Sequence, residues 1–438
     1  LEAADLSLND EVLVYIDGDS TNANTVTSAG SAGLTGLDLY GSNLIVRHDT
    51  GSSLTNAQLS NAYYADAGDI IYSVSGSDLT VTEGLYIWTG DTYAPGGDVT
   101  APGTLIISSG ATLALNGSGI TLNNTGGSFS NNGTLELEGN EALTGFTNDV
   151  DSGTVKYTGA GTYSQLLAGD TYYNLTINGS GSWTLDAALD ANNALIISNG
   201  TLNAAGYAMT IAGSFSNSGT FTHENNTVIL NGTGTQNITS GGSLFYNLII
   251  NKASGTAVLA DALDVDNDLT IASGSTVDID NYNLTVSNTF SNEGTLKLQG
   301  EQTINVTMDT DSGTVYYDGA GTYSQLSAGD TYYNLTINGS GSWTLDAAST
   351  INNDFTLTDG SITQSDDLTI TGDFAQAGGI FACTDPINDS FSVGGSFSIP
   401  AIAGAFRRAS GSDPNYTIYD VYGLQSMKCW LAKNFTLA

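Results

Sequence analysis

The chain has few basic residues, cysteines and prolines, and it has no long hydrophobic run. Eight Lys and Arg stand against 45 Asp and Glu, which gives a formal net charge of −37 over 438 residues. A surface of this charge repels phosphate backbones, so we exclude nucleic acid as a partner. No apolar run approaches the roughly 18 to 20 residues of a membrane-spanning helix, so we expect no membrane-spanning segment.

The two cysteines, Cys383 and Cys429, both lie near the C-terminus. In an oxidising compartment they could form a disulfide, and two separate thiols are the alternative. Five prolines accompany 54 glycines and abundant Asn, Ser and Thr, which supply turns rather than helices. Short alternating runs such as NLTI, SWTL and GTLEL recur, whereas helical spacing is rare. The chain is therefore predicted to be nearly all β.

The clearest feature present is an internal repeat. Residues 151–188 return at 311–348 with three differences: Lys156 against Tyr316, Thr158 against Asp318, and Leu167 against Ser327. A looser copy occupies 227–251, and its strand phrase at 247–250 falls between those at 174–177 and 334–337. We refer to these stretches as the first, middle and last copies.

The strand phrase NLTI at 174–177 is followed by a similar phrase, ALII, at 194–197. This spacing predicts coils of about 20 residues, with about four coils in each repeat unit of about 75 to 87 residues. Alternate residues of each phrase are apolar, as expected where one side of a strand faces a core. A parallel β-helix fits best, because each coil buries what its neighbour leaves exposed. A string of β-sandwiches of about 80 residues is the competing fold.

Three regions are expected along the chain. Residues 1–99 do not repeat and form an N-terminal β cap, which an open solenoid end requires; its strand candidates are 11–16, 43–47, 69–74, 79–82 and 85–89. Residues 100–400 form the repeat solenoid. Residues 401–438 hold four of the eight Lys and Arg and a short helix candidate at 424–432, which indicates a small C-terminal module.

Acidic clusters are the best ligand candidates. Asp264, Asp266 and Asp268 stand as Asp-x-Asp-x-Asp, like the first half of a Ca²⁺ loop, although the following Gly and the distal Glu are missing. We predict that Ca²⁺ binds here; alternatively these carboxylates cap turns. Neither His48 nor His223 belongs to a recognisable motif, and no set of catalytic residues can be identified in the sequence. We therefore predict that the chain is not an enzyme.

The repeat phrases TYYNLTINGSGSWTL and SFSNSGT resemble the repeat sequences of large secreted bacterial surface proteins, similar to filamentous-haemagglutinin-type and autotransporter-type adhesins. Residues 410–438 resemble the lead-in of GLUG-motif surface proteins, with matches at Gly411, Asp413, Pro414, Ile418, Leu424, Met427 and Leu437. The tyrosine of that pattern comes one position late, at Tyr416, and the GLUG repeats are absent. The resemblance implies a right-handed β-helix, secretion to the cell surface, and a natural protein that continues past Ala438.

We therefore expect a non-enzymatic extracellular structural protein, a β-helical rod that assembles into, or projects from, a cell-surface layer, sheath or filament. Its expected partners are further copies of itself, joined through strand edges, or other cell-surface components and glycans. Two alternatives stay open. One is an adhesin stalk, and the other is a β-helix that binds or cleaves polysaccharide, since a glycosidase needs only two suitably spaced carboxylates.

Overall fold

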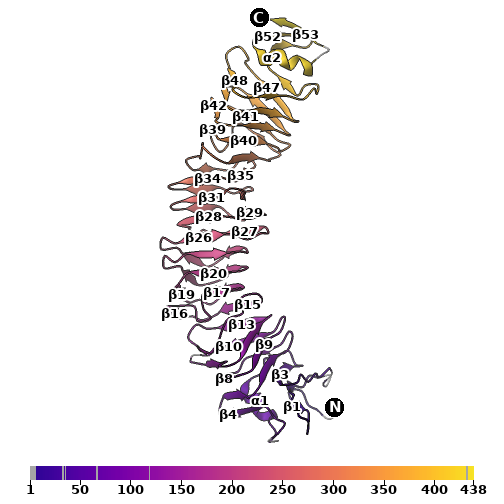
Figure 1. The fold of residues 1–438 in the computed structure, drawn as a ribbon, viewed down its shortest axis with the longest axis vertical. Coiled ribbons are helices and arrows are strands. Elements are labelled where there is room, and N and C mark those ends of the chain that lie inside the picture. The colour runs from indigo at the N-terminus through magenta and orange to yellow at the C-terminus, as the bar shows by residue number, and fades with distance from the viewer. Residues whose placement is uncertain (1–5, 32–33, 35, 66–67, 118, 431–432) are drawn as a thin grey trace. The chain divides into compact units, whose positions relative to one another are not determined.

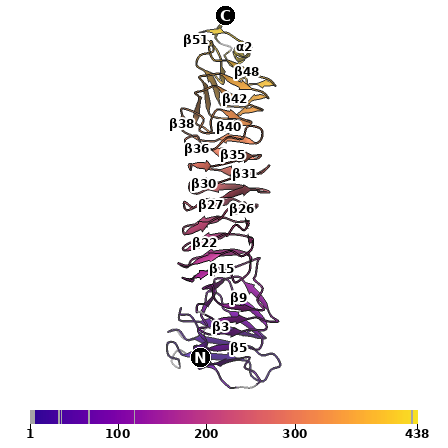
Figure 2. The same ribbon diagram turned by 90° about the vertical axis from the view of Figure 1, so that its left-hand side faces the viewer.

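A computed structural model describes residues 6–31, 34, 36–65, 68–117, 119–430 and 433–438. The chain divides into two units, Leu1–Asn226 and Thr227–Ala438. Within each unit, short strands from successive turns of the chain lie one above another and pair mostly in parallel (Figure 1, Figure 2). The prediction of an all-β parallel solenoid is confirmed, and the competing string of sandwiches is wrong.

The first unit begins with three sheets that enclose one core. The first runs β1 (Glu11–Tyr15), β2 (Asn24–Ser28), β3 (Asn43–His48), β6 (Gly84–Ile87), β9 (Thr104–Ile107) and β12 (Ser128–Asn131). The second runs β7 (Thr92–Tyr93), β10 (Thr112–Leu115), β13 (Thr134–Leu137), β15 (Thr154–Tyr157), β18 (Asn174–Ile177), β21 (Leu195–Ile197) and β24 (Phe215–Asn217). The third runs β4 (Tyr72–Ser75), β5 (Asp78–Val81), β8 (Val99–Thr100), β11 (Thr121–Asn123) and β14 (Ala142–Thr144).

Later coils of this unit add two further sheets. One contains β16 (Thr162–Tyr163), β19 (Ser182–Thr184), β22 (Thr201–Asn203) and β25 (Thr220–Thr222). The other contains β17 (Thr171–Tyr172), β20 (Leu189–Ala191) and β23 (Met209–Ile211). Each coil therefore contributes one strand to each of three faces.

The second unit repeats this plan. Its longest sheet runs β27 (Gln236–Thr239), β29 (Thr256–Leu259), β32 (Thr276–Asp278), β35 (Thr295–Leu298), β37 (Thr314–Tyr317), β40 (Asn334–Ile337), β43 (Phe355–Leu357), β46 (Phe374–Gln376) and β49 (Phe397–Ser398). A second face contains β26 (Thr227–Leu230), β28 (Asn247–Ile250), β31 (Leu269–Ile271) and β34 (Phe290–Asn292), and beside it lie β30 (Leu263–Val265), β33 (Leu284–Val286) and β36 (Ile304–Asn305).

The last coils of the second unit form three more sheets. One contains β38 (Thr322–Tyr323), β41 (Ser342–Leu345), β44 (Ser361–Gln364), β47 (Ile380–Cys383) and β50 (Phe406–Arg407). Another contains β39 (Thr331–Tyr332), β42 (Ser349–Ile351), β45 (Leu368–Ile370) and β48 (Phe391–Val393). A separate small sheet contains β51 (Ser410–Ser412), β52 (Asn415–Ile418) and β53 (Asn434–Leu437).

The coil length follows directly from strand register. Thr154 pairs with Asn174 between β15 and β18, and Thr314 pairs with Asn334 between β37 and β40. Both pairs advance the chain by about 20 residues, which confirms the predicted coil. Leu175 and Ile177 of the NLTI strand are fully buried, because alternate side chains of each short strand point into the core.

Asparagine side chains tie neighbouring coils together at one corner. Asn174 Nδ2 donates to the carbonyl of Gly153 in the coil before it, at 2.8 Å. Asn174 Oδ1 accepts from Asn193 Nδ2 in the coil after it, also at 2.8 Å. Amide side chains suit this place because they donate and accept at once, which satisfies backbone groups where the chain leaves the sheet.

The expected cap region, 1–99, already contains stacked parallel strands. β2 pairs in parallel with β3, β3 with β6, and β6 with β9, while β1 covers β2 in antiparallel register. Strand β2 lies in a stretch where the sequence predicted no strand, and the helix α1 (Asn56–Ala62) was not predicted at all. The boundaries at 99 and 400 stay predictions.

The C-terminal module contains the predicted helix, displaced toward its N-terminus. Helix α2 spans Val421–Ser426 and continues as a 3-10 turn, η1 (Met427–Cys429). Asp420 caps α2 by accepting from the backbone N–H of Gly423 at 2.6 Å, which explains the early start. Residues 431 and 432 of the predicted helix lie outside the described residues. None of the described helices is long and apolar enough to cross a membrane.

Candidate functional site

The predicted Ca²⁺ ligands lie on and just after β30. Asp264 and Asp266 are exposed and Asp268 is half-buried. Asp268 Oδ1 accepts from Asn288 Nδ2 at 2.9 Å and from the N–H of Thr289 at 3.2 Å, so it caps the next coil. Across the ranges that the structure describes, no three His, Cys, Asp or Glu side chains gather into a group that could hold a metal ion.

The two cysteines are free and buried. Arg408 Nη1 donates to Cys383 Sγ at 3.3 Å, and Cys429 Sγ donates to the carbonyl of Pro400 at 3.2 Å. Each thiol thus has its own polar partner, and the disulfide between Cys383 and Cys429 that the sequence offered as a candidate is not formed. Burial raises the pKa of the Cys383 thiol, which keeps it protonated and unreactive at neutral pH.

The repeated tryptophans and several of the repeated tyrosines belong to the core. Trp183 and Trp343 are 0% and 1% exposed. Tyr163 stacks on Trp183 at 5.1 Å between ring centroids, and Tyr157 and Tyr172 meet through their hydroxyls at 3.3 Å. Trp183 and Trp343 are therefore core residues and do not form an aromatic strip on the surface.

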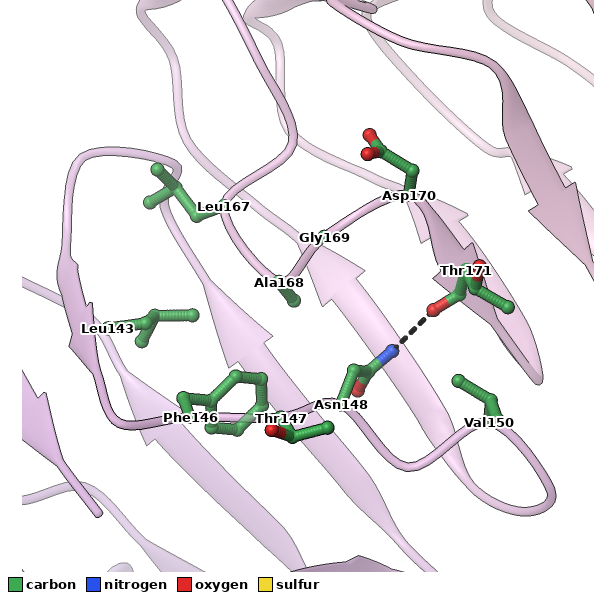
Figure 3. A pocket seen from close by; sticks show the side chains of 10 residues that line it. All are labelled: Leu143, Phe146, Thr147, Asn148, Val150, Leu167, Ala168, Gly169, Asp170 and Thr171. Atoms are coloured by element: carbon green, nitrogen blue, oxygen red, sulfur yellow. Dashed lines mark hydrogen bonds between the residues drawn. The ribbon is translucent and has the colours of Figure 1, made fainter. Parts of the chain in front are cut away.

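A surface groove of about 370 Å³ lies where two loops of the first unit face each other (Figure 3). On one side stand Leu143 of β14 and Phe146 of the loop after it. On the other side runs the loop from Leu167 to Thr171, and Asn148 Nδ2 bridges the two by donating to the Thr171 carbonyl at 2.9 Å. Phe146 anchors the loop after β14 to β12, because its ring centroid lies 4.7 Å from that of Phe129.

The groove combines apolar side chains with two polar groups. Leu143, Phe146 and Leu167 are half-buried, so part of each apolar surface faces water. The carbonyl oxygen of the Asn148 amide is buried without a hydrogen-bond partner among the described residues. Burial, and then the nearby charge of Asp186, raise the pKa of the Asp170 carboxyl. The groove can therefore hold a small ligand with apolar and hydroxyl character.

At the matching loop of the last copy lies a groove of about 490 Å³ with a different lining, which includes Met308, Asp309 and Thr310. Ser327 replaces Leu167, and in the loop before the copy Thr310 stands in the place of Val150. Ser327 instead lines a different groove of about 350 Å³. The groove residues escaped sequence analysis because 143–150 shows neither strand alternation nor a turn phrase. The sequence feature that could have revealed the groove is a set of three apolar residues, Leu143, Phe146 and Val150, within an otherwise polar stretch.

Comparison with known proteins adds no further constraint on this site. No protein-family model, curated protein or solved structure matches the chain at a significant level.

Proposed function

We propose that this chain is a non-enzymatic extracellular structural protein, a β-solenoid that assembles into, or projects from, a cell-surface layer, sheath or filament. The observation that carries the proposal is how the two near-identical copies use their shared side chains. The Tyr157–Tyr172 contact recurs as Tyr317–Tyr332 at the same 3.3 Å, buried in the core. Repetition of the same packing serves stacking of coils, whereas a reaction site needs a locally distinct set of groups.

An open strand edge in the C-terminal module supports self-association. Among the described residues, β53 pairs only with β52. The N–H groups of Asn434 and Ala438 donate toward β52, to the carbonyls of Pro414 and Ile418 at 2.7 and 2.8 Å. In a parallel pair alternate residues donate to the same neighbour, so the N–H of Leu437 faces away. Leu437 is 68% exposed, and such an edge can pair with another chain.

The net charge sets the conditions for assembly. Copies that each carry a net charge of −37 repel one another, and the repulsion falls as salt shortens the screening length. Divalent cations such as Ca²⁺ would act most strongly, by bridging exposed carboxylates such as Asp264 of neighbouring chains.

Electron microscopy of the purified chain, in millimolar Ca²⁺ and again in EDTA, tests the proposal. Ordered filaments or sheets in Ca²⁺ are expected, and their loss in EDTA would assign a bridging role to the acidic side chains. Isolated particles in both conditions would contradict assembly.

A matched pair of variants tests the role of the edge. Leu437→Pro removes the outward N–H and should abolish or shorten the assemblies, whereas Leu437→Ala keeps that N–H and should assemble. Assembly of both variants like the parent chain would show that β53 is not the joining edge.

A further inference from the structure

Three aromatic side chains gather on the outer face of the first sheet. Leu85 and Ile87 of β6 point into the core and are fully buried, so Tyr86 and Trp88 point outward. Tyr40, from the loop before β3, lies over both, with ring centroids 5.1 Å from Tyr86 and 6.0 Å from Trp88. We call Tyr40, Tyr86 and Trp88 the aromatic ledge.

The ledge is held in place from one side. The guanidinium of Arg47 lies 5.6 Å from the ring centre of Trp88. Arg47 is itself fixed, because it donates to the carbonyl of Gly36 at 2.7 Å and to the carboxylate of Asp49 at 2.5 Å. Trp88 is half-buried and Tyr40 is 39% exposed, so the ledge is rigid on its Arg47 side and open to solvent at Tyr40.

A groove of about 450 Å³ runs beside the ledge, at the start of the same strands. Its floor is the row Asn43, Gly84 and Thr104, which are in register across β3, β6 and β9. Two residues further along β6 and β9 come Tyr86 of the ledge and Ile106, which also lines the groove. Gly84 keeps the floor open, since a Cβ there would stand 2.3 Å from Asn43 Oδ1.

The groove contains a hydrogen-bond acceptor that the protein does not satisfy. Glu83 lines the groove, and its Oε2 is buried without a hydrogen-bond partner among the described residues. A buried acceptor left unpaired costs free energy, and a hydroxyl from a ligand would relieve that cost. The Asn43 amide and the Thr104 hydroxyl lie in the same row and supply further donors and acceptors.

We propose that the aromatic ledge and this groove bind a neutral glycan chain. Sugar rings present a C–H face that packs against aromatic and apolar side chains, and a rim of hydroxyls that hydrogen-bond carboxylates and amides. Acidic sugars and phosphates fit poorly, because the groove contains Glu83 and the protein has a net charge of −37. The cation nearest the ledge, Arg47, is already paired with Asp49. The glycan would fix the solenoid to a polysaccharide surface.

The test is titration of the intact chain with neutral hexasaccharides (cellohexaose, mannohexaose, xylohexaose and laminarihexaose) and with hexagalacturonate as the acidic comparator. At least one neutral hexasaccharide should bind with a Kd of about 1 mM or lower. Trp88 provides an optical signal, because Trp183 and Trp343 are buried in the core and Trp430 belongs to the second unit. Trp88→Phe should remove most of the fluorescence change.

Variants then locate the site. Tyr40→Ala should weaken binding about tenfold, and Glu83→Gln, which keeps one acceptor, about threefold. Tyr207→Ala is the matched control, since Tyr207 is 41% exposed on another part of the first unit, and its Kd should not change. Circular dichroism checks that each variant folds.

Three outcomes would overturn the proposal: no binding of any neutral hexasaccharide, tighter binding of hexagalacturonate, or a Tyr40→Ala variant that binds like the parent chain. Assembly is measured separately by microscopy without glycan, so failure here leaves the structural role standing, and the reverse also holds.

Discussion

The first and last copies share almost every residue and fold into the same strands, whereas the middle copy places its matching strand on another face. The phrase NLTI forms β18 in the first copy and β40 in the last, each with the preceding strand of the copy as its neighbour. In the middle copy NLII forms β28. Within the second unit, β28 lies in the sheet of β26, β31 and β34, and β40 lies in the sheet of β37 and β43.

The spacing of the copies explains this difference. The step from Asn174 to Asn334 equals eight coils of about 20 residues, so the last copy returns to an equivalent place in its coil. The step from Asn247 to Asn334 equals four such coils and about a third of a fifth one. In a coil of three strands, a third of a coil is one face. The phrase therefore encodes a strand, and its position along the coil decides the face.

Two of the three differences between the near-identical copies concern one ion pair. Lys156 Nζ contacts Glu136 of the preceding coil at 2.9 Å. In the last copy Tyr316 replaces this lysine, and the cation moves one coil back to Lys297, which contacts Asp318 at 2.5 Å. Both copies therefore place opposite charges on neighbouring coils, with the lysine on the later coil in the first copy and on the earlier coil in the last copy.

The largest difference is expected between a chain that loses whole coils and one that also loses a fraction of a coil. Removal of residues 175–334 joins Asn174 to Leu335, restores the phrase NLTI next to β15, and takes out eight coils. The shortened chain should keep a cooperative thermal transition within about 5 °C of the parent chain. Circular dichroism during heating measures this.

The control for that excision removes half a coil more. Deleting residues 175–344 joins Asn174 to Leu345, so the strands after the junction no longer match the coil before it. This chain should lose the cooperative transition. Equal stability of the two shortened chains would show that coil length does not determine the face.

Truncating a core tryptophan should destabilise either copy strongly. Trp343→Ala and Trp183→Ala each remove a ring that is at most 1% exposed, and each should lower the free energy of unfolding by about 3–5 kcal/mol. Urea denaturation followed by circular dichroism gives the values. A cost below about 1 kcal/mol at either position would contradict the stacked core.

A turn carboxylate that lies two residues before each of these copies should contribute a pH-dependent share of stability. Burial pushes the pKa of Asp149 upward, but hydrogen bonds from the N–H groups of Asn131 and Asp151 outweigh it and hold the pKa below its usual range. The folded state then favours the carboxylate. Its stabilisation is present above the ordinary Asp pKa and is lost as pH falls through the folded-state value.

Asp149→Ala should therefore cost about 1–2 kcal/mol at pH 7, and the difference from the parent chain should shrink in acid. Urea unfolding at neutral and acidic pH measures both values. Asp309→Ala should behave alike, since Asp309 accepts from the equivalent N–H groups of Asn292 and Asp311. A cost that does not change with pH would mean that the charge has no part in it.

Removing the indole nitrogen should lower the free energy of unfolding by different amounts in the two copies, and this difference should be smaller than the effects above. Trp343 Nε1 donates to the carbonyl of Gln299 at 3.2 Å, whereas Trp183 Nε1 is buried without a partner among the described residues. Trp343→Phe breaks a hydrogen bond, and Trp183→Phe removes an unsatisfied donor. Trp343→Phe should therefore cost about 1 kcal/mol more than Trp183→Phe in the same denaturation experiment. Equal costs would show that the bond contributes nothing.

Removing the exchanged lysines should have the smallest effect. Lys297 contacts two carboxylates, those of Asp278 and Asp318, and Lys156 contacts one. Because these side chains are partly exposed, Lys297→Met should cost about 0.5–1 kcal/mol and Lys156→Met about half of that, with both costs falling at high salt. A larger cost for Lys156→Met would reverse the comparison.

Several tertiary features were hidden from sequence analysis for identifiable reasons. Helix α1 is only seven residues long, and its one strong signal was the capping box, in which Thr55 and Gln58 bond each other's backbone. The groove beside Phe146 depends on a loop packed against the next coil. Whether the cysteines pair could not be predicted, because the spacing of Cys383 and Cys429 in sequence carries no distance in space.

The sequence by itself determined that the chain forms short strands, stacks them in coils of about 20 residues, and fills the interior with the alternate apolar side chains. These properties are local, because side-chain alternation and corner residues repeat within one coil. Only the tertiary structure decided which face each copy occupies, which acidic side chains cap turns, and that Tyr40 meets Tyr86 and Trp88. Those outcomes depend on the summed length of many coils and on loops folding back over the sheet, and no short stretch of sequence contains either quantity.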